Sequence, residues 1–423
     1  MIKKILIIYP HFPPSNLAGV HRPRLFVQHL PSFGWDPVIL TVHEDFYEEK
    51  PDHNIVKLLQ KGLRIEKVNA FKRVGPVGDI GLRGFFQLFK KGKKLLSKES
   101  FDFLYIPIPS FYCALLGRLL HSSTGIKYGI DYIDPWVHYF PGSEKVFSRH
   151  WLSTQLAKFL EPIAVKKASL ITGVAQGYYE PVLDRNPHLK NIITGAMPYG
   201  GEEKDHAIVA ALQIEPYLFQ KKVAKFQFVY AGAMLPKAYL PLENIFKAIA
   251  ANRALFINTE FHFIGTGKTP DDKNGYNIKP LAEKFGLYNS IVFEYPARIP
   301  YLDVLVHLNI SDAVFILGST EPHYTPSKVY QAVLSAKPIF AVLHKDSSAV
   351  KVIEDTHVGI VRKFDGESDV INIANNFAND LISFLKFFKA FTPSQVDHKQ
   401  FQEFSAFSVT EKLSVLLNKT MAL

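Results

Sequence analysis

The sequence has 423 residues, of which 47% are hydrophobic and 21% charged, a composition that excludes disordered and fibrous proteins. The single cysteine, Cys113, excludes an internal disulfide and indicates a reducing compartment, while no apolar run is long enough for a signal peptide or a membrane span. The net charge of +10 falls entirely within residues 1–200, so we expect that half to face an anionic partner. Lipid headgroups and a phosphorylated acceptor fit better than nucleic acid, because no nucleic-acid-binding motif accompanies the charge.

Short apolar runs alternate with helical patterns along most of the chain. In the first half, a helix is expected at 20–33, and the predicted strands are 5–9, 38–42, 63–68, 103–106, 127–133 and 170–174. After Gly200 and Gly201 the pattern restarts, with predicted strands at 226–231, 260–264, 291–294, 313–317 and 338–342. Such runs joined by helical crossovers indicate parallel sheets with both faces covered. The sequence therefore predicts an α/β protein with two Rossmann-like, doubly wound domains facing a cleft.

The length also fits two domains, because a single core rarely grows beyond about 250–300 residues. We place the first domain at 1–200 and the second at 201–390. The remaining segment, 391–423, is predicted to be helical and to pack back towards the first domain.

The most informative local sequence is 321–331, EPHYTPSKVYQ, directly after a predicted strand. Thr325 suits an N-cap and Pro326 the first helical position, which places Ser327 and Lys328 in the first turn. A lysine there opposes the helix dipole unless an anion is bound. The segment therefore predicts a phosphate at this helix end, held by backbone amides, the serine hydroxyl and the ammonium group. The alternative is an exposed lysine on an ordinary helix.

Two glycine turns follow other predicted strands of the same domain. Gly232 ends the strand at 226–231, with Lys237 five residues later, and Gly265 begins the sequence GTGK after the strand at 260–264. Glycine permits close approach of the backbone to a diphosphate. Each turn alone has the simpler interpretation of an ordinary connection, and together they favour several phosphate-binding loops at one sheet edge.

The order of these and other motifs resembles the retaining GT-B glycosyltransferases of family 4 (glycosyl transferases group 1). TPSKVYQ at 325–331 with AKPI at 336–339 resembles the "PSK-x-x-E…GKP" segment of that family. The other similar segments are FPP at 12–14, Ala18, Gly19 and Arg22, GWDPV at 34–38, DYIDPW at 131–136, residues 161–169, and PYGG at 198–201. The resemblance covers nearly the whole chain and implies that 1–200 is the acceptor side and 201–390 binds the nucleotide sugar.

The resemblance also implies roles for single residues. Glu321 would contact the donor sugar, Ser327 and Lys328 the diphosphate, and Gly19 the donor across the cleft. Gln331 stands where the family has a glutamate that binds ribose, which puts the strength of ribose binding, and with it activity, in doubt. Ala233 stands where an arginine is usual. The complete set predicted to bind the donor is Gly19, Gly232, Lys237, Gly265, Arg298, Thr325, Ser327, Lys328 and Gln331.

The predicted activity is transfer of a sugar from a nucleotide diphosphate such as UDP to a glycan, a lipid-linked acceptor or another hydroxyl, with retention of configuration. Glu321, Asp134 and His138 are the predicted catalytic residues. Asp134 has the alternative of capping a helix, and His138 that of an ordinary surface loop residue. No Asp-x-Asp triplet occurs, and family members generally need neither a metal nor another cofactor, so none is expected. The alternatives are a nucleotide-sugar 2-epimerase and a non-catalytic nucleotide-binding protein of the same fold.

A basic segment at 82–98 is a candidate for membrane contact. It combines apolar residues at helical spacing with six lysines or arginines and no acid. Such a helix is typical of proteins that lie on an anionic membrane, and the alternative is a helix whose apolar face packs on its own sheet. We therefore expect a cytoplasmic protein. The basic helix adds the alternative that the protein lies peripherally on the inner face of the membrane.

Overall fold

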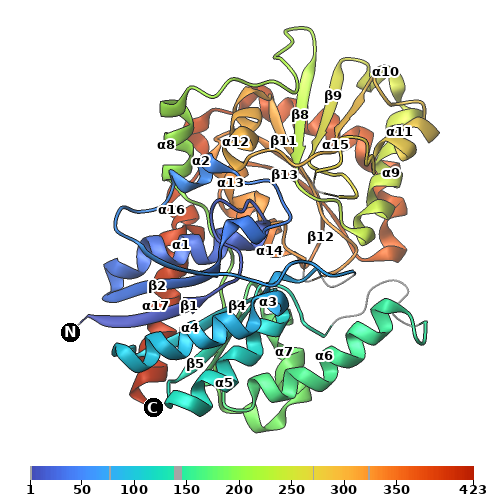
Figure 1. The fold of residues 1–423 in the computed structure, drawn as a ribbon. Coiled ribbons are helices and arrows are strands. Elements are labelled where there is room, and N and C mark those ends of the chain that lie inside the picture. The colour runs from blue at the N-terminus through green and yellow to red at the C-terminus, as the bar shows by residue number, and fades with distance from the viewer. Residues whose placement is uncertain (1, 76–77, 138–144, 270, 323) are drawn as a thin grey trace. The chain divides into compact units, whose positions relative to one another are not determined.

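The computed structural model describes residues 2–75, 78–137, 145–269, 271–322 and 324–423 (Figure 1). The chain divides into two compact units: unit 1 is Met1–Tyr199 with Ala406–Leu423, and unit 2 is Gly200–Ser405. Each unit is built on a parallel sheet with helices on both faces, which confirms the predicted α/β class with two Rossmann-like domains. Residues 391–405 belong to unit 2, so only the last part of the segment 391–423 lies in unit 1.

The sheet of unit 1 has seven parallel strands in the order β3-β2-β1-β4-β5-β6-β7. The strands are β1 (Lys3–Ile8), β2 (Trp35–Val42), β3 (Arg64–Val68), β4 (Phe103–Ile108), β5 (Tyr128–Tyr132), β6 (Leu170–Gly173) and β7 (Ile193–Ala196). The order of connections reverses between β1 and β4, so the loops that follow these two strands diverge from a shared crevice at the carboxyl edge. The predicted strands all form, and β7 is an additional edge strand.

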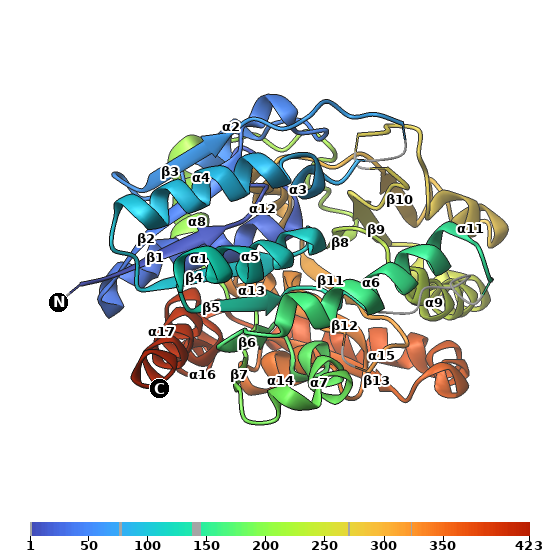
Figure 2. The same cartoon turned by 60° about the horizontal axis from the view of Figure 1, so that its bottom comes forward.

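Two layers of helices cover this sheet. One layer contains α4 (Phe85–Lys98), α5 (Ala114–Thr124), α6 (Arg149–Val165) and α7 (Gln176–Arg185), whose buried residues share one core. On the other face, α1 (His21–His29) and the C-terminal helix α17 (Ala406–Ala422) share a second core. Figure 2 shows α17, in red, beside the elements of unit 1. Two single turns, α2 (His53–Val56) and α3 (Ile80–Arg83), complete the unit.

The predicted basic helix at 82–98 is interrupted at Gly84, which separates α3 from α4. Leu88 and Leu95 of α4 are buried, and Phe85 and Phe89 are partly buried against the same core. The apolar face of α4 therefore packs mostly against the core of its own unit, which was the alternative to membrane contact.

The sheet of unit 2 has six parallel strands in the order β10-β9-β8-β11-β12-β13. They are β8 (Phe226–Ala231), β9 (Thr259–Ile264), β10 (Val292–Tyr295), β11 (Ala313–Leu317), β12 (Ile339–His344) and β13 (Gly359–Phe364). Aromatic side chains suit a half-buried pleated surface, and phenylalanines of β8, β9, β11 and β12 pack together in one core.

The helices of unit 2 are α8 (Glu203–Leu212), α9 (Tyr239–Ala251), α10 (Arg253–Phe256), α11 (Lys279–Lys284), α12 (Tyr301–Ile310), α13 (Lys328–Leu334), α14 (Ser348–Asp355), α15 (Ile371–Ala390) and α16 (His398–Phe401). The phenylalanine core lies under α9, α11 and α15, while α12, α13 and α14 contact strands β8, β11 and β12. No helix of the described residues is long and apolar enough to cross a bilayer.

Candidate functional site

The loops of unit 2 that carry predicted donor-binding residues follow four adjacent strands. Arg298 comes after β10, Gly265 after β9, Gly232 after β8 and Glu321 after β11. Because the strands are parallel, their carboxyl ends meet at one edge, the edge where doubly wound sheets bind ligands. The backbone of this edge is tied together, since the Gly232 amide donates to the carbonyl at the end of β9 and the Gly265 amide to the carbonyl at the end of β10.

The Lys328 side chain lies across this edge, against the loop after β8. Gly232 has φ of +128°, and a Cβ added there would lie 3.1 Å from Lys328 Nζ. The ammonium also lies over the ring of Tyr230, 3.4 Å from its centroid. Glycine at position 232 thus provides both the left-handed backbone and the space into which the lysine reaches.

The Nζ atom of Lys328 is buried and has no hydrogen-bonding partner among the residues that the structure describes. Burial lowers the pKa of Lys328 well below the ordinary value, because the charged form loses its hydration. A buried, unpaired cation is costly and is normally retained for an anionic ligand or a chemical role.

The start of α13 corrects one prediction. The helix begins at Lys328, and Ser327 occupies the N-cap position without a side-chain capping bond. Thr325 is not the N-cap, since its hydroxyl is hydrogen-bonded to the Ser348 hydroxyl at the start of α14, 2.6 Å away. Lys328 therefore reaches the carboxyl edge of the sheet, beside Gly232, from the first position of the helix.

Lys237 and Glu321 form an ion pair between the loops after β8 and β11, with 3.4 Å between Nζ and Oε1. The Thr320 amide also donates to the Lys237 carbonyl oxygen. Both charged side chains are well exposed, so the pair contributes little stability and can exchange partners. The Glu321 carboxylate therefore lies at the same edge as Lys328, with a cation beside it.

Gln331 lies about one turn into α13, where its Oε1 is 2.9 Å from Nε2 of His206 on α8. Burial lowers the pKa of His206, and the contact with Gln331 opposes that effect only in part. A neutral imidazole that donates to a glutamine oxygen satisfies both groups. His206 thus contacts a predicted donor-binding residue, Gln331, and nothing in the sequence pattern indicated this contact.

In unit 1, Gly19 follows β1 in a short 3-10 turn (Ala18–Val20). A Cβ added to Gly19 would lie 2.2 Å from the Tyr9 hydroxyl oxygen, and Tyr9 is buried. A side chain at this position is therefore excluded by the packing of the loop itself, which is a structural reason for glycine beside the predicted donor contact.

Asp134 follows β5 at the carboxyl edge of unit 1, and more than a third of its surface is exposed. Desolvation nevertheless raises the pKa of Asp134 to about 6. A carboxyl group that exchanges its proton near neutral pH suits contact with a sugar hydroxyl. His138, the other predicted catalytic residue of this loop, lies outside the described residues.

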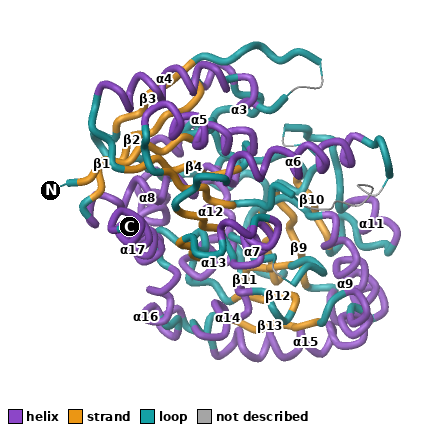
Figure 3. Tube along the Cα trace, turned by 90° about the horizontal axis from the view of Figure 1, so that it is seen from below, coloured by secondary structure: helices purple, strands orange, loops and turns teal. Residues whose placement is uncertain are grey.

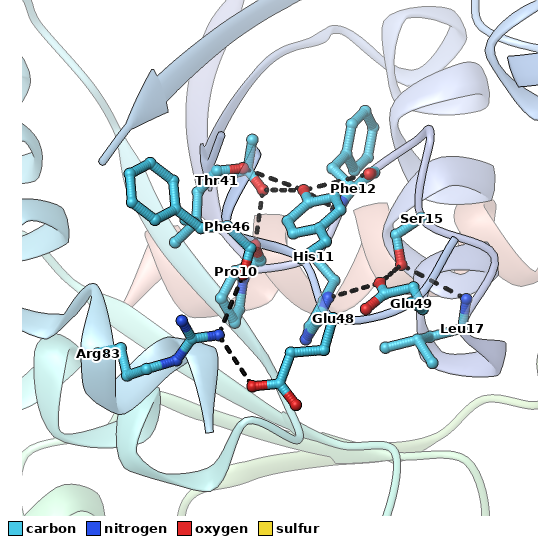
Figure 4. A network of polar contacts seen from close by, with 12 residues as sticks. Pro10, His11, Phe12, Ser15, Leu17, Thr41, Phe46, Glu48, Glu49 and Arg83 are labelled. Carbon is cyan, nitrogen blue, oxygen red and sulfur yellow. Dashed lines mark hydrogen bonds and ion pairs between the residues drawn. The ribbon is translucent and has the colours of Figure 1, made fainter. Parts of the chain in front are cut away.

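The loop after β1 holds a polar cluster that the sequence did not indicate (Figure 4). His11 Nδ1 lies 3.0 Å from Glu49 Oε1, and the Ser15 hydroxyl donates to the same oxygen. Burial alone would raise the pKa of Glu49, but these two hydrogen bonds and the histidine outweigh it and lower the pKa to about 2. An ionised Glu49 thus fastens the loop after β1 to the loop after β2.

A second buried ion pair anchors the start of α1. Arg22 donates to both oxygens of Asp131 on β5, at 2.5 and 2.9 Å, and to the carbonyls of Met197 and Pro198. The Thr172 hydroxyl donates to Asp131 as well. Arg22 and Asp131 both belong to motifs that resemble those of family 4. In this structure their ion pair links α1 to β5 within unit 1. The described residues contain no group of three His, Cys, Asp or Glu that could hold a metal.

Comparisons with known proteins show similarity at the level of three-dimensional structure. No protein-family model matches the chain, and neither does any curated protein sequence. A sucrose-phosphate synthase from Thermosynechococcus elongatus superposes with a TM-score of 0.63 at 15% identity, covering 99% of both chains. HepE of Anabaena, solved with UDP and glucose, gives 0.63 at 14% identity over 99% of this chain and 100% of its own.

A UDP-forming α,α-trehalose-phosphate synthase from Burkholderia xenovorans gives a TM-score of 0.66 at 10% identity over 99% of both chains. These are two-domain glycosyltransferases. The chain has the GT-B fold. At such identities the GT-B similarity establishes the architecture, and the residues themselves must carry any argument about activity.

Proposed function

We propose that the protein is a glycosyltransferase that transfers a sugar from a nucleoside diphosphate to a hydroxyl of a glycan, a lipid-linked molecule or a related acceptor. The proposal includes retention of the anomeric configuration and a reaction without a protein-bound metal, both of which rest on the resemblance to family 4. UDP is the favoured nucleotide, because HepE was solved with UDP and with UDP-glucose.

The observation that carries the proposal is the buried, unpaired ammonium of Lys328. It lies beside Gly232, at the carboxyl edge of the sheet, which is where doubly wound folds bind ligands. A phosphate oxygen placed there would provide a counter-charge that the described residues do not supply. The adjacent Ser327 hydroxyl and the backbone at Gly265 lie along the same carboxyl edge.

The chemistry follows from where charge develops. As the bond between the anomeric carbon and the diphosphate breaks, negative charge accumulates on the leaving phosphate oxygen. A preorganised cation at this point lowers the barrier, because it requires no rearrangement during the reaction. Lys328 is held by its packing on Tyr230 and is therefore already in place.

Two carboxyl groups are proposed to handle the sugars. Glu321 would accept hydrogen bonds from donor-sugar hydroxyls, with Lys237 keeping it ionised until the sugar arrives. Asp134, with its pKa near 6, would contact a hydroxyl of the donor sugar or the acceptor from the edge of unit 1. Both roles need only hydrogen bonding and fit a reaction without a dedicated protein nucleophile.

The direct test is a calorimetric titration of the full chain with UDP and GDP. We expect one site per chain, with affinity that falls strongly in Lys328→Met. The matched control is Lys337→Met, since Lys337 is also a half-buried lysine with a lowered pKa but precedes β12 at the opposite edge of the sheet. Equal affinities for the two variants would overturn the assignment of the diphosphate site.

A second candidate is a non-catalytic nucleotide-binding protein. It is favoured by Gln331, whose oxygen is already engaged by His206, and by Ala233 in place of the usual arginine. Nucleotide binding without hydrolysis or transfer of any UDP- or GDP-sugar would select this candidate. Formation of a C2 epimer of the donor would instead select the 2-epimerase, which leaves the basic first half without a role.

A further inference from the structure

The surface helix α6 (Arg149–Val165) of unit 1 is apolar on two opposite sides. Its inner side buries residues against the core of the unit, namely Thr154, Ala157, Glu161, Ala164 and Val165. Its outer side exposes a second set, the α6 stripe, namely Leu152, Leu156, Phe159 and Ile163. Figures 2 and 3 show α6 along its length, with α5 of the same unit beside it.

The spacing of the α6 stripe makes it one continuous surface. At about 100° per residue, its four side chains fall within an arc of about 60°, while the buried set is centred on the opposite side. Phe159 is 69% exposed, and two apolar residues that precede the helix, Val146 and Phe147, are exposed as well. Soluble surface helices ordinarily place charged residues on the side away from the core, so a second apolar side indicates a second partner.

Among the described residues of this stretch, the charges around the α6 stripe are basic. Between residues 145 and 167 the described basic residues are Lys145, Arg149, Lys158, Lys166 and Lys167. The single acid of this stretch, Glu161, points inward and is neutralised by Arg185, 2.8 Å away. By helical position, Arg149, Lys166 and Lys167 flank the stripe at its two ends, so their charges border the apolar surface.

We propose that α6 is the surface by which unit 1 docks on an anionic membrane, with the α6 stripe inserted at the level of the headgroups and the flanking basic residues bound to anionic lipid phosphates. An apolar stripe bordered by cations complements a surface of anionic headgroups above hydrocarbon, whereas a protein partner of ordinary composition would not require uniform positive charge. Trp151 and Phe147, whose ring centroids lie 5.5 Å apart, supply aromatic groups of the kind found at membrane interfaces.

This membrane surface differs from the one expected from the sequence, which was the basic helix at 82–98. In that segment Phe85 and Phe89 pack against the core, and Lys91 forms an ion pair with Glu66. Phe86 is the large apolar residue of α4 that stays exposed, at 71%. This makes Phe86 a control of nearly the same exposure as Phe159.

The test is flotation of the full chain with phosphatidylcholine vesicles that contain or lack phosphatidylglycerol. We expect binding to the anionic vesicles alone, and release by salt, since charge attraction is screened within about 8 Å at physiological ionic strength. Phe159→Ser should weaken binding about tenfold or more, the equivalent of withdrawing one large apolar side chain from the interface. Phe86→Ser should leave binding unchanged.

A charge pair gives a second, independent measurement. Lys166→Glu combined with Lys167→Glu should weaken binding by about 25-fold or more, at roughly fivefold for each basic residue lost. The matched change on α4 is Lys93→Glu with Lys94→Glu, which alters the net charge equally and should have a much smaller effect. Melting curves of all variants should coincide with that of the parent, because the substituted side chains are exposed.

Three results would overturn the proposal. They are equal binding to neutral and anionic vesicles, a loss of binding that follows the α4 variants rather than the α6 variants, and a dimer that Phe159→Ser dissociates in the absence of vesicle binding. The last would assign the α6 stripe to a second copy of the chain. None of these measurements depends on sugar transfer, so they leave the proposed activity to its own test.

Discussion

Replacing Lys328 by methionine keeps most of the length and volume of the side chain and removes its charge. The ammonium lies 3.4 Å from the centroid of the Tyr230 ring and makes no hydrogen bond to the described part of the chain. A cation–π contact contributes about 0.5–2 kcal/mol, whereas the desolvation of an unpaired ion costs several kcal/mol. We therefore expect the ligand-free variant to be as stable as the parent or more stable by about 1–3 kcal/mol in urea unfolding.

The same substitution should have the opposite effect on binding. Loss of one buried, charge-assisted contact to a phosphate costs about 2–4 kcal/mol, or roughly 30-fold to 1,000-fold in the dissociation constant for UDP. Calorimetry and urea unfolding of the same protein preparations measure both effects. A variant that loses more than about 1 kcal/mol of stability yet binds UDP normally would refute the reasoning, because Lys328 would then be an ordinary structural residue.

The pH dependence gives an additional check. The pKa of Lys328 in the folded protein lies below the ordinary 10.5, so between these two values the unfolded chain binds more protons than the folded one. Stability of the parent should therefore rise with pH through this window and level off above 10.5. Lys328→Met should lack this part of the rise, and bound UDP should also reduce it by raising the lysine pKa.

Three further predictions concern neighbouring positions. Gln331→Glu should preserve or strengthen UDP affinity and raise the pKa of His206, measurable by NMR titration; a large loss of affinity in the folded variant would place the ribose elsewhere. Because the pKa of Asp134 is raised from 3.8 to about 6, parent stability should fall as pH rises through that window. Asp134→Asn should reduce this loss of stability by about 1 kcal/mol, a value that allows for solvent screening. Gly19→Ala should cost about 1–3 kcal/mol through its clash with the Tyr9 hydroxyl, and Tyr9→Phe in the same chain should restore part of the loss if the clash is the cause.

The sheets could be predicted well because buried strands are apolar on both faces. The two strands that escaped prediction, β7 and β13, are edge strands. Their residues are mostly half-buried, and β13 carries Arg362 and Lys363. Edge strands contact fewer neighbours, so their sequences lack the continuous apolar run that marks a central strand.

The sequence indicated which residues follow the strands at the carboxyl edge of unit 2, but not how their side chains pack. The strand-glycine turns and the lysine after Pro326 indicated a phosphate-binding edge. The helix dipole describes only part of this position, because α13 begins at Lys328 itself and the decisive property of that lysine is the burial of its Nζ atom. Burial depends on Tyr230 and Gly232, about a hundred residues away in sequence, and no local pattern reports such a contact.

The prediction of a membrane surface has the same limit, because it too depends on packing that the sequence pattern does not report. Helical periodicity located α4, but periodicity cannot say whether an apolar face meets the sheet of its own unit or another partner. On α6 both sides are apolar, so the pattern alone has no single face to assign. Exposure in the folded chain is what separates the buried side from the α6 stripe.

The return of α17 to unit 1 has a consequence for the order in which the chain folds during synthesis. Val409, Leu413 and Leu417 fill the core beside Trp35, Phe26 and Phe103. A ribosome releases all of unit 2 before these residues emerge, so unit 2 can complete its core while unit 1 still exposes an apolar face. The newly made first unit therefore needs protection from aggregation until α17 emerges, and a chain truncated just before Ala406 would lack part of the first unit but none of the second.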